Sequence, residues 1–278
     1  MKKISSITKD TICCISIASK PGNFGSLIFN RTFKTLNLDY IYKPFCVVPK
    51  DLSTAVQSIR VFGIKGCGVS MPHKTVMYKY LDRVDKAAKE IGAVNTIVNE
   101  KGFLTGYNTD VIGVEKALGL FYKVKGKSAH IIGTGGAARA VIVALKKAGC
   151  KRIVISARDN KKAQKLAKEF FVEYSLSEKR TSIQADILIN ATPVGMTPNT
   201  KDMIVAKDEI KNYSAVMDVV VSPLTTTLIQ EAKKQKKVVI PGYIMALHQA
   251  AAQFTLYTNK EAPIPLMTKY VKAILKEK

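Results

Sequence analysis

The sequence predicts an α/β protein with two domains, the second of them built on a doubly wound sheet. Three observations indicate this fold class. Short apolar runs alternate with helical segments along most of the chain, as in sheets whose strands are joined by helices. A glycine-rich turn that begins at Gly133 follows one apolar run and opens a helical pattern. The 278 residues, 47% of them hydrophobic, are enough to bury two cores.

The first domain is expected to alternate strands with helices. Apolar runs of strand length predict the strands, and residues that repeat with the helical period predict the helices. The expected strands are residues 11–18, 40–48, 66–70 and 93–98, and the expected helices lie near 27–36, 52–62 and 75–81.

The second domain begins the alternation again after a helix. Asp110 is suited to the N-cap of a helix over 110–120, because its carboxylate can accept the first backbone N–H groups. The domains accordingly span residues 1–105 and 106–241, with C-terminal helices over 242–278. Further strands are expected at 129–132, 152–156, 187–190, 215–219 and 238–240, and helices at 244–257 and 266–276.

The chain has a formal net charge of +23, from 44 basic and 21 acidic residues. Such a charge is also found in proteins that bind nucleic acid. Only seven of the basic residues are arginines, and the lysines are spread along the chain without a zinc-finger, basic-helix or RNA-recognition pattern. We interpret the lysines as a solvated surface that would attract anionic small molecules, and we expect no nucleic-acid partner.

Four features predict a cytoplasmic protein without a metal site. No apolar run reaches the ~18 residues of a membrane-spanning helix. The start Met1-Lys2-Lys3 resembles a secretory leader, but polar residues 5–10 interrupt the apolar stretch that a leader requires. The five cysteines are odd in number and lack CxxC spacing, so we expect reduced thiols. The three histidines, His73 and His248 among them, lack the spacing of metal ligands.

The turn at Gly133 has the spacing of a dinucleotide-binding turn between a strand and a helix. Gly133 permits a tight turn, and Gly135 lets the backbone approach a pyrophosphate. Ala138, in the third-glycine position, keeps the helix close to the strand. The N-terminus of that helix would face the phosphates. The alternative is a glycine turn with a purely structural role. The expected cofactor-binding residues of the turn are Gly133, Thr134, Gly135, Gly136 and Ala137.

The end of the next strand indicates which dinucleotide binds. In NAD-binding domains an acidic residue lies there, about 20 residues after the turn, and binds the ribose 2′-hydroxyl. Here Arg158 can pair bidentately with the 2′-phosphate of NADP, and Lys162 adds positive charge nearby. Asp159, one residue further, keeps NAD as the alternative, and Arg158 could also be an ordinary surface arginine.

Six segments resemble the shikimate dehydrogenase family, in the family's order and across nearly the whole chain. They are GCGVSMPHK (66–74), GAVNT (92–96), GYNTD (106–110), GTGGAARA (133–140), NATPVGM (190–196) and GYIMALHQA (242–250). The resemblance implies an N-terminal substrate domain, a Rossmann-like nucleotide-binding domain and C-terminal helices that return to the first domain. It also implies reversible, NADP-dependent reduction of 3-dehydroshikimate to shikimate, a step of aromatic amino acid biosynthesis.

The resemblance assigns roles to single residues. The family's catalytic lysine and aspartate match Lys74 and Asp110. As an ammonium, Lys74 can polarise and protonate a ketone oxygen as hydride arrives, while Asp110 orients the ring hydroxyls and holds the lysine charge. The remaining matches are Asn95 and Gln249 for the ring hydroxyls, Ser70 at a substrate-binding threonine position, and Thr192 and Gly242 on the cofactor side.

The sequence departs from the family where the substrate carboxylate is held. Most members use a Ser-x-Ser pair before the first long helix. Alignment on the helix asparagine, Asn30, places Asn23 and Gly25 at those positions, and Val221 stands where a tyrosine is usual. We therefore expect Asn23 to contact the substrate, shikimate binding to be weaker than in a standard enzyme, and the chain to resemble the divergent shikimate dehydrogenase-like branch.

Three alternatives remain open from the sequence. The chain could act on quinate or another hydroxylated ring acid, as a quinate dehydrogenase or as a dehydrogenase-like paralogue. It could also be a basic protein that keeps the nucleotide-binding fold without turnover.

Two further points stay open from the sequence. Gln253, one helical turn from Gln249, either shares the face of Gln249 or faces solvent. A monomer or a homodimer is expected.

Overall fold

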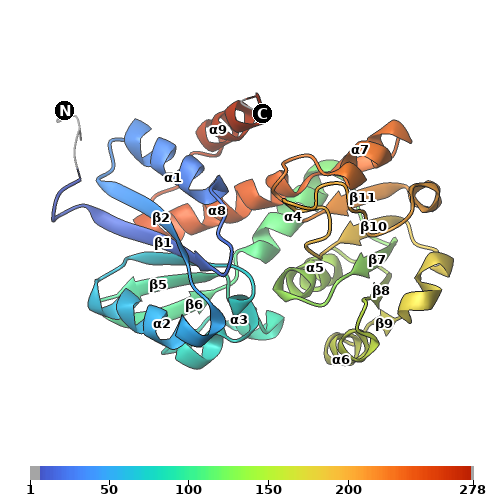
Figure 1. The fold of residues 1–278 in the computed structure, drawn as a ribbon, viewed down its shortest axis with the longest axis horizontal. Coiled ribbons are helices and arrows are strands. Elements are labelled where there is room, and N and C mark those ends of the chain that lie inside the picture. Colours follow the sequence, from blue (N-terminus) through green and yellow to red (C-terminus); the bar gives the residue numbers. More distant parts are fainter. Residues whose placement is uncertain (1–6, 277–278) are drawn as a thin grey trace. The chain divides into compact units, whose positions relative to one another are not determined.

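The computed structural model describes residues 7–276, which form two compact units, each with its own six-stranded sheet (Figure 1). Unit 1 contains the chain up to residue 109 and again from residue 249, and unit 2 contains residues 110–248. The predicted α/β class with two domains is confirmed. The leader-like residues at the start of the chain, 1–6, lie outside the described part.

The sheet of unit 1 is mixed and has the strand order β2-β1-β3-β5-β6-β4. β1 lies parallel to β2 and to β3, whereas β5 is antiparallel to β3 and to β6. The strands are β1 (Ile12–Ala18), β2 (Tyr40–Cys46), β3 (Gly66–Val69), β4 (Arg83–Val84), β5 (Thr96–Glu100) and β6 (Phe103–Tyr107). The helices are α1 (Phe24–Thr35), α2 (Leu52–Val61), α3 (Lys86–Ile91), α9 (Ile264–Lys276) and the part of α8 (Gly242–Thr258) from residue 249.

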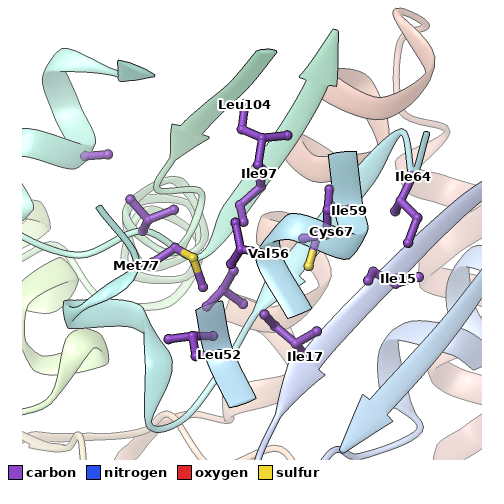
Figure 2. Packing of buried hydrophobic residues seen from close by; sticks show 13 residues of the cluster. Ile15, Ile17, Leu52, Val56, Ile59, Ile64, Cys67, Met77, Ile97 and Leu104 are labelled. Carbon is purple, nitrogen blue, oxygen red and sulfur yellow. The ribbon is translucent and has the colours of Figure 1, made fainter. Parts of the chain in front are cut away.

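Each face of this sheet is covered by apolar side chains of different helices. On one face, Val56 and Ile59 of α2 pack with Ile15, Ile17 and neighbouring strand residues (Figure 2). On the other face aromatic rings dominate, with Phe29 of α1 stacked on Tyr42 of β2 at 4.6 Å between centroids and Phe33 packed 5.8 Å from Phe254 of α8. α9 packs against α1, so the C-terminal helices complete unit 1.

Two features of unit 1 differ from the expectation. Residues 75–81, expected as a helix, form two short 3₁₀ turns, His73–Thr75 and Met77–Tyr80. Within the second turn only Met77 is buried, so no apolar face holds a longer helix against the sheet. The β5–β6 hairpin was also not expected, because its turn is Lys101-Gly102 rather than Asn-Gly, although both residues adopt the positive φ that such a turn needs.

Unit 2 has a fully parallel sheet with the order β12-β11-β10-β7-β8-β9. The strand order reverses beside β7, which makes this the switch point at which doubly wound sheets bind ligands. Every strand expected in this unit forms, to within one residue at each end. The strands are β7 (Ser128–Ile132), β8 (Arg152–Ser156), β9 (Glu173–Tyr174), β10 (Ile187–Asn190), β11 (Ala215–Asp218) and β12 (Val238–Ile240). The helices are α4 (Asp110–Phe121), α5 (Gly136–Lys147), α6 (Asn160–Phe170), α7 (Thr227–Lys234) and the first turns of α8.

Three observations on residues 7–276 concern membrane helices, cysteine thiols and metal-binding side chains. Between residues 7 and 276, no helix is long and apolar enough to cross a membrane. The five cysteines are free thiols. Across the same residues, no three His, Cys, Asp or Glu side chains gather in a way that could hold a metal ion.

Candidate active site

A buried cluster of amides and hydroxyls in unit 1 brings together three segments that are far apart in the sequence. Asn95 lies just before β5, Thr109 follows β6, and Gln249 belongs to α8. Asn95 Nδ2 donates to Gln249 Oε1 at 3.3 Å and to Thr109 Oγ1 at 3.0 Å. The backbone N–H of Thr109 donates to Asn95 Oδ1 at 2.7 Å. The two residues expected to bind ring hydroxyls, Asn95 and Gln249, are therefore in direct contact.

Lys74 lies beside this cluster through its backbone. The N–H of Val94, the residue before Asn95, donates to the backbone oxygen of Lys74 at 2.9 Å. The preceding residue, His73, is 1% exposed, and its Nε2 lies 2.8 Å from the backbone oxygen of Val47. A carbonyl oxygen only accepts, so Nε2 must carry the proton. His73 thus ties the lysine segment to the end of β2 and is a structural residue rather than a metal ligand.

The segment that carries Asn23 meets the segment that carries Ser70 at the carboxyl ends of β1 and β3. The backbone N–H of Ser19 donates to the backbone oxygen of Met71 at 3.0 Å. The backbone N–H of Ser70 donates to the backbone oxygen of Ile17 at 2.9 Å. Asn23 is exposed at the start of α1 and its side chain makes no capping hydrogen bond. Ser70 and Asn23 are both open to solvent at this edge.

Asp110 begins α4, as expected, and is 3% exposed. It is the first residue of unit 2 and directly follows Thr109, the threonine bonded to Asn95. The residues expected to bind the cofactor belong to unit 2 as well.

The glycine turn of unit 2 has the geometry that a dinucleotide requires. Gly133 adopts a φ of 129°, and a Cβ there would lie 2.7 Å from the backbone oxygen of Ala191, so only glycine fits. A Cβ at Gly135 would meet nothing within 4 Å, which leaves open space over the backbone. Thr134, Gly136 and Ala137 complete the turn and the start of α5.

The N-terminus of α5 fits an anion. Gly135 occupies the N-cap without a side-chain hydrogen bond, and the first turn contains no acidic residue. The positive end of the helix dipole and the first N–H groups are therefore suited to a pyrophosphate. Ala138 is fully buried, which allows α5 to lie close to the sheet.

The charged residues that follow β8 are those expected to distinguish NADP from NAD. The backbone N–H of Gly133 donates to the oxygen of Ser156 at 2.9 Å, so the glycine turn adjoins this strand end. Asp159 is the N-cap of α6 and accepts from the backbone N–H of Lys162 at 3.1 Å. This hydrogen bond lowers the pKa of the Asp159 carboxyl. The Lys162 ammonium lies 3.5 Å from the same carboxylate, whereas Arg158 is exposed just before it.

Thr192 and Gly242 shape the loops after β10 and β12. The Thr192 hydroxyl donates to Asn190 Oδ1 at 2.7 Å and accepts from the N–H of Val194 at 3.1 Å. Its polar group is thus used within its own loop, and its methyl group lies toward Gly133. A Cβ at Gly242 would lie 2.2 Å from the backbone oxygen of Val220, so this position requires glycine for close packing.

The sequence reading missed part of the cluster in unit 1. Thr96 and Thr109 are 0% and 2% exposed and bond Asn95, yet neither was among the expected site residues. Gln253, whose environment was left open, is 4% exposed and faces the cluster. The repeated Asn-Thr pairs at 95–96 and 108–109 are the sequence feature that could have indicated the threonines.

Three family models match successive parts of the chain. The shikimate dehydrogenase substrate-binding domain matches residues 24–97, and the shikimate/quinate 5-dehydrogenase model matches residues 115–222. The shikimate 5′-dehydrogenase C-terminal domain matches residues 242–272. These ranges contain the lysine segment, the glycine turn and Gln249, respectively.

Relatives named as shikimate dehydrogenases or shikimate dehydrogenase-like proteins are similar over almost their full length. A shikimate dehydrogenase-like protein of Haemophilus influenzae is 39% identical over 91% of this chain and 93% of its own. A shikimate dehydrogenase (NADP(+)) of Methanocaldococcus jannaschii is 40% identical over 88% and 90%. A crystal structure of a shikimate dehydrogenase in complex with NADP+ superimposes with a TM-score of 0.88 at 37% identity, covering 97% of each chain. The chain belongs to the shikimate dehydrogenase family.

Proposed function

We propose that this protein is an NADP-dependent dehydrogenase that interconverts 3-dehydroshikimate and shikimate. In this proposal unit 1 is the substrate domain and unit 2 the NADP domain. The observation that carries the proposal is the direct hydrogen bond between Asn95 and Gln249, from distant segments, in a polar cluster that adjoins the backbone of Lys74. A group of amide donors beside a lysine suits a small ring that carries several oxygens.

Each residue has a separate task in the proposed reaction. The glycine turn and Arg158 would hold NADP, which when bound would supply hydride to, or receive it from, the ring carbon. Lys74 donates a proton to the ketone oxygen in the reducing direction and takes it back in the other. Asp110 orients the ring hydroxyls and the lysine ammonium, and Asn95 and Gln249 hold further ring oxygens. Arg158 binds the 2′-phosphate, because Asp159 is engaged at the start of α6.

The substrate carboxylate is proposed to bind at the open edge formed by the Asn23 and Ser70 segments. The Ser19 hydroxyl already donates to the backbone oxygen of Val47 at 3.3 Å, so it contributes little there. The exposed groups at this edge include the amide of Asn23, the ammonium of Lys20 and the hydroxyl of Ser70. This altered edge supports a place in the divergent branch and weaker binding of shikimate than in a standard enzyme.

Quinate, or another hydroxylated ring acid, is the second candidate substrate. It is favoured by the same altered edge, and the family model over residues 115–222 is named for both shikimate and quinate. The protein is proposed to work in the cytoplasm as a monomer or homodimer.

Steady-state reduction of NADP+ across shikimate, quinate and related ring acids tests the proposal. We expect turnover with shikimate and a KM above the low micromolar range. Turnover with quinate alone would select the second candidate. Absence of turnover with every ring acid, combined with salt-sensitive retention on heparin, would instead favour a basic protein without catalysis.

A further inference from the structure

The cluster around Asn95 has a fixed hydrogen-bond direction, because main-chain groups define both of its ends. Gln253 Nε2 lies 3.3 Å from the backbone oxygen of Asn95, which can only accept. At the other end the backbone N–H of Thr109, which can only donate, bonds Asn95 Oδ1 at 2.7 Å. The amides of Gln253 and Asn95 therefore each have one orientation.

Thr96 connects these two ends. Gln253 Nε2 donates to Thr96 Oγ1 at 2.9 Å, and the Thr96 hydroxyl donates to Asn95 Oδ1 at 2.8 Å. A hydroxyl has a single proton, so the hydrogen bond that Thr96 accepts from Gln253 favours its role as donor toward Asn95. These three residues are at most 4% exposed, so water does not readily replace either bond.

The direction continues from Asn95 to Gln249. Because Asn95 Nδ2 donates to Gln249 Oε1, the oxygen end of the Gln249 amide is used inside the protein. The two N–H groups of Asn95 already donate to Thr109 and Gln249, so Asn95 acts here by fixing the orientation of the Gln249 amide. The end of that amide that faces away from Asn95 is its NH₂ group. A ring oxygen with lone pairs fits this donor, whereas a ring ammonium does not.

We propose that Gln253 is a positioning residue that acts through Thr96 and Asn95 to hold the Gln249 amide with its NH₂ group toward the ring oxygens of the substrate. This inference rests on the proposed function, in which Asn95 and Gln249 bind the substrate. Gln253 itself lies behind Asn95 and Thr96 and does not touch the ring.

The hydrogen bonds from Gln253 to Thr96 and from Thr96 to Asn95 form a relay. Two substitutions that keep the volume of the side chain interrupt this relay at different residues. Gln253→Met and Thr96→Val should each raise KM for shikimate about tenfold, the value of one lost hydrogen bond, and leave KM for NADP+ within about twofold. Thr255→Val is the matched control, because Thr255 is exposed on the same helix and its hydroxyl donates to the backbone oxygen of Ala251 at 3.3 Å. That control should retain both wild-type KM values.

Gln253→Glu tests the direction of the relay through pH. An ionised carboxylate cannot donate to Thr96 and would accept its proton, so kcat/KM for shikimate relative to wild type should fall about 100-fold above neutral pH. Protonation restores a donor, so the ratio should recover as the pH is lowered. A purely structural role would give a ratio that does not change with pH.

The outcomes separate the inference from the proposed function. No turnover by the wild-type chain with any ring acid would contradict both. Wild-type turnover together with unchanged KM for shikimate in Gln253→Met and Thr96→Val would contradict the positioning role alone. Equal rises in KM for shikimate and NADP+, with a lowered Tm, would also contradict it. If Gln253→Glu does not fold, the two isosteric variants decide the question.

Discussion

Arg158 and Asp159 are adjacent charged residues whose local bonding gives them different roles. The Asp159 carboxylate caps α6 and has the Lys162 ammonium 3.5 Å away, so it is already used within the protein. Arg158 precedes the cap and is exposed at the end of β8. The Asp159 carboxylate is therefore occupied at the start of α6, in keeping with the proposed role of Arg158 toward a 2′-phosphate.

Removal of the Arg158 guanidinium should affect the two cofactors unequally. We expect Arg158→Ala to weaken NADP(H) binding by ~1.5 to 3 kcal/mol, about 10- to 150-fold, because a charge-assisted hydrogen bond is lost. NAD binding should barely change. Titration of both cofactors checks this, with Lys165→Ala on α6 as a control for general positive charge. Equal affinities of the wild type for NADP and NAD would contradict the assignment.

Lys74 should contribute to the chemical step more than to binding. Lys74→Met is expected to lower kcat by ~10² to 10⁴, the usual value of a positioned acid or base, with a smaller effect on KM. Asp110→Asn should be similarly damaging. Lys79→Met, at an exposed position of the following 3₁₀ turn, is the control. Near wild-type turnover in Lys74→Met would show that another group transfers the proton.

At the scale of elements, a buried histidine joins two strands and a loop of unit 2. His130 of β7 is 0% exposed, with Nε2 2.7 Å from the Ser156 hydroxyl of β8 and Nδ1 2.9 Å from that of Tyr213. A neutral ring satisfies both hydroxyls in either tautomer. Burial lowers the pKa of His130 to about 4.

This histidine should make stability fall as the solution is acidified. The unfolded chain takes up the proton near pH 6.5, whereas the folded chain takes it up only near its lowered pKa of about 4. The contribution is therefore complete above about pH 6.5 and is lost toward pH 4, by about 3 kcal/mol in all. Urea unfolding of wild type and His130→Gln across this range measures it. Parallel curves of unfolding free energy against pH would contradict the prediction.

The loop before α1 should limit the affinity for the substrate carboxylate. Asn23→Ser combined with Gly25→Ser restores the hydroxyls usual in the family. A Cβ at Gly25 would lie 3.4 Å from the Tyr42 ring, an ordinary contact, so the serine can be accommodated. We expect the double variant to lower KM for shikimate about tenfold or more, the value of one charge-assisted hydrogen bond. An unchanged or higher KM would contradict the claim that the missing hydroxyls limit the affinity.

The sequence predicted elements best where pattern and local chemistry agree. The central strands β7, β10 and β11 of unit 2 are mostly apolar and buried on both faces, and they form where expected. The hairpin of β5 and β6 was not predicted, because a Lys101-Gly102 turn is a weaker sequence signal for a hairpin than Asn-Gly. Gln253 could not be placed by helical period alone, since its burial depends on Thr96 and the backbone of Asn95.

At the scale of the whole molecule, most of the residues proposed to bind the substrate and those proposed to bind the cofactor lie in different units. Unit 1 is formed by the start and the end of the chain and holds Lys74, Asn95 and Gln249, while unit 2 holds the glycine turn and Arg158. The motifs could indicate these residues from the sequence, but not their mutual contacts, which join positions as far apart as 95 and 249. The net charge of +23 is compatible with an anionic substrate and a phosphorylated cofactor.

The central claim is that hydride passes between a ring carbon of the substrate and NADP, and isotope transfer tests it most directly. Shikimate that carries deuterium at C3 is incubated with NADP+ and the wild-type protein, and the product cofactor is examined by mass spectrometry. We expect the NADPH to contain one deuterium, and the same incubation with Lys74→Met to form labelled NADPH far more slowly. Absence of NADPH, or NADPH without deuterium, would contradict the account.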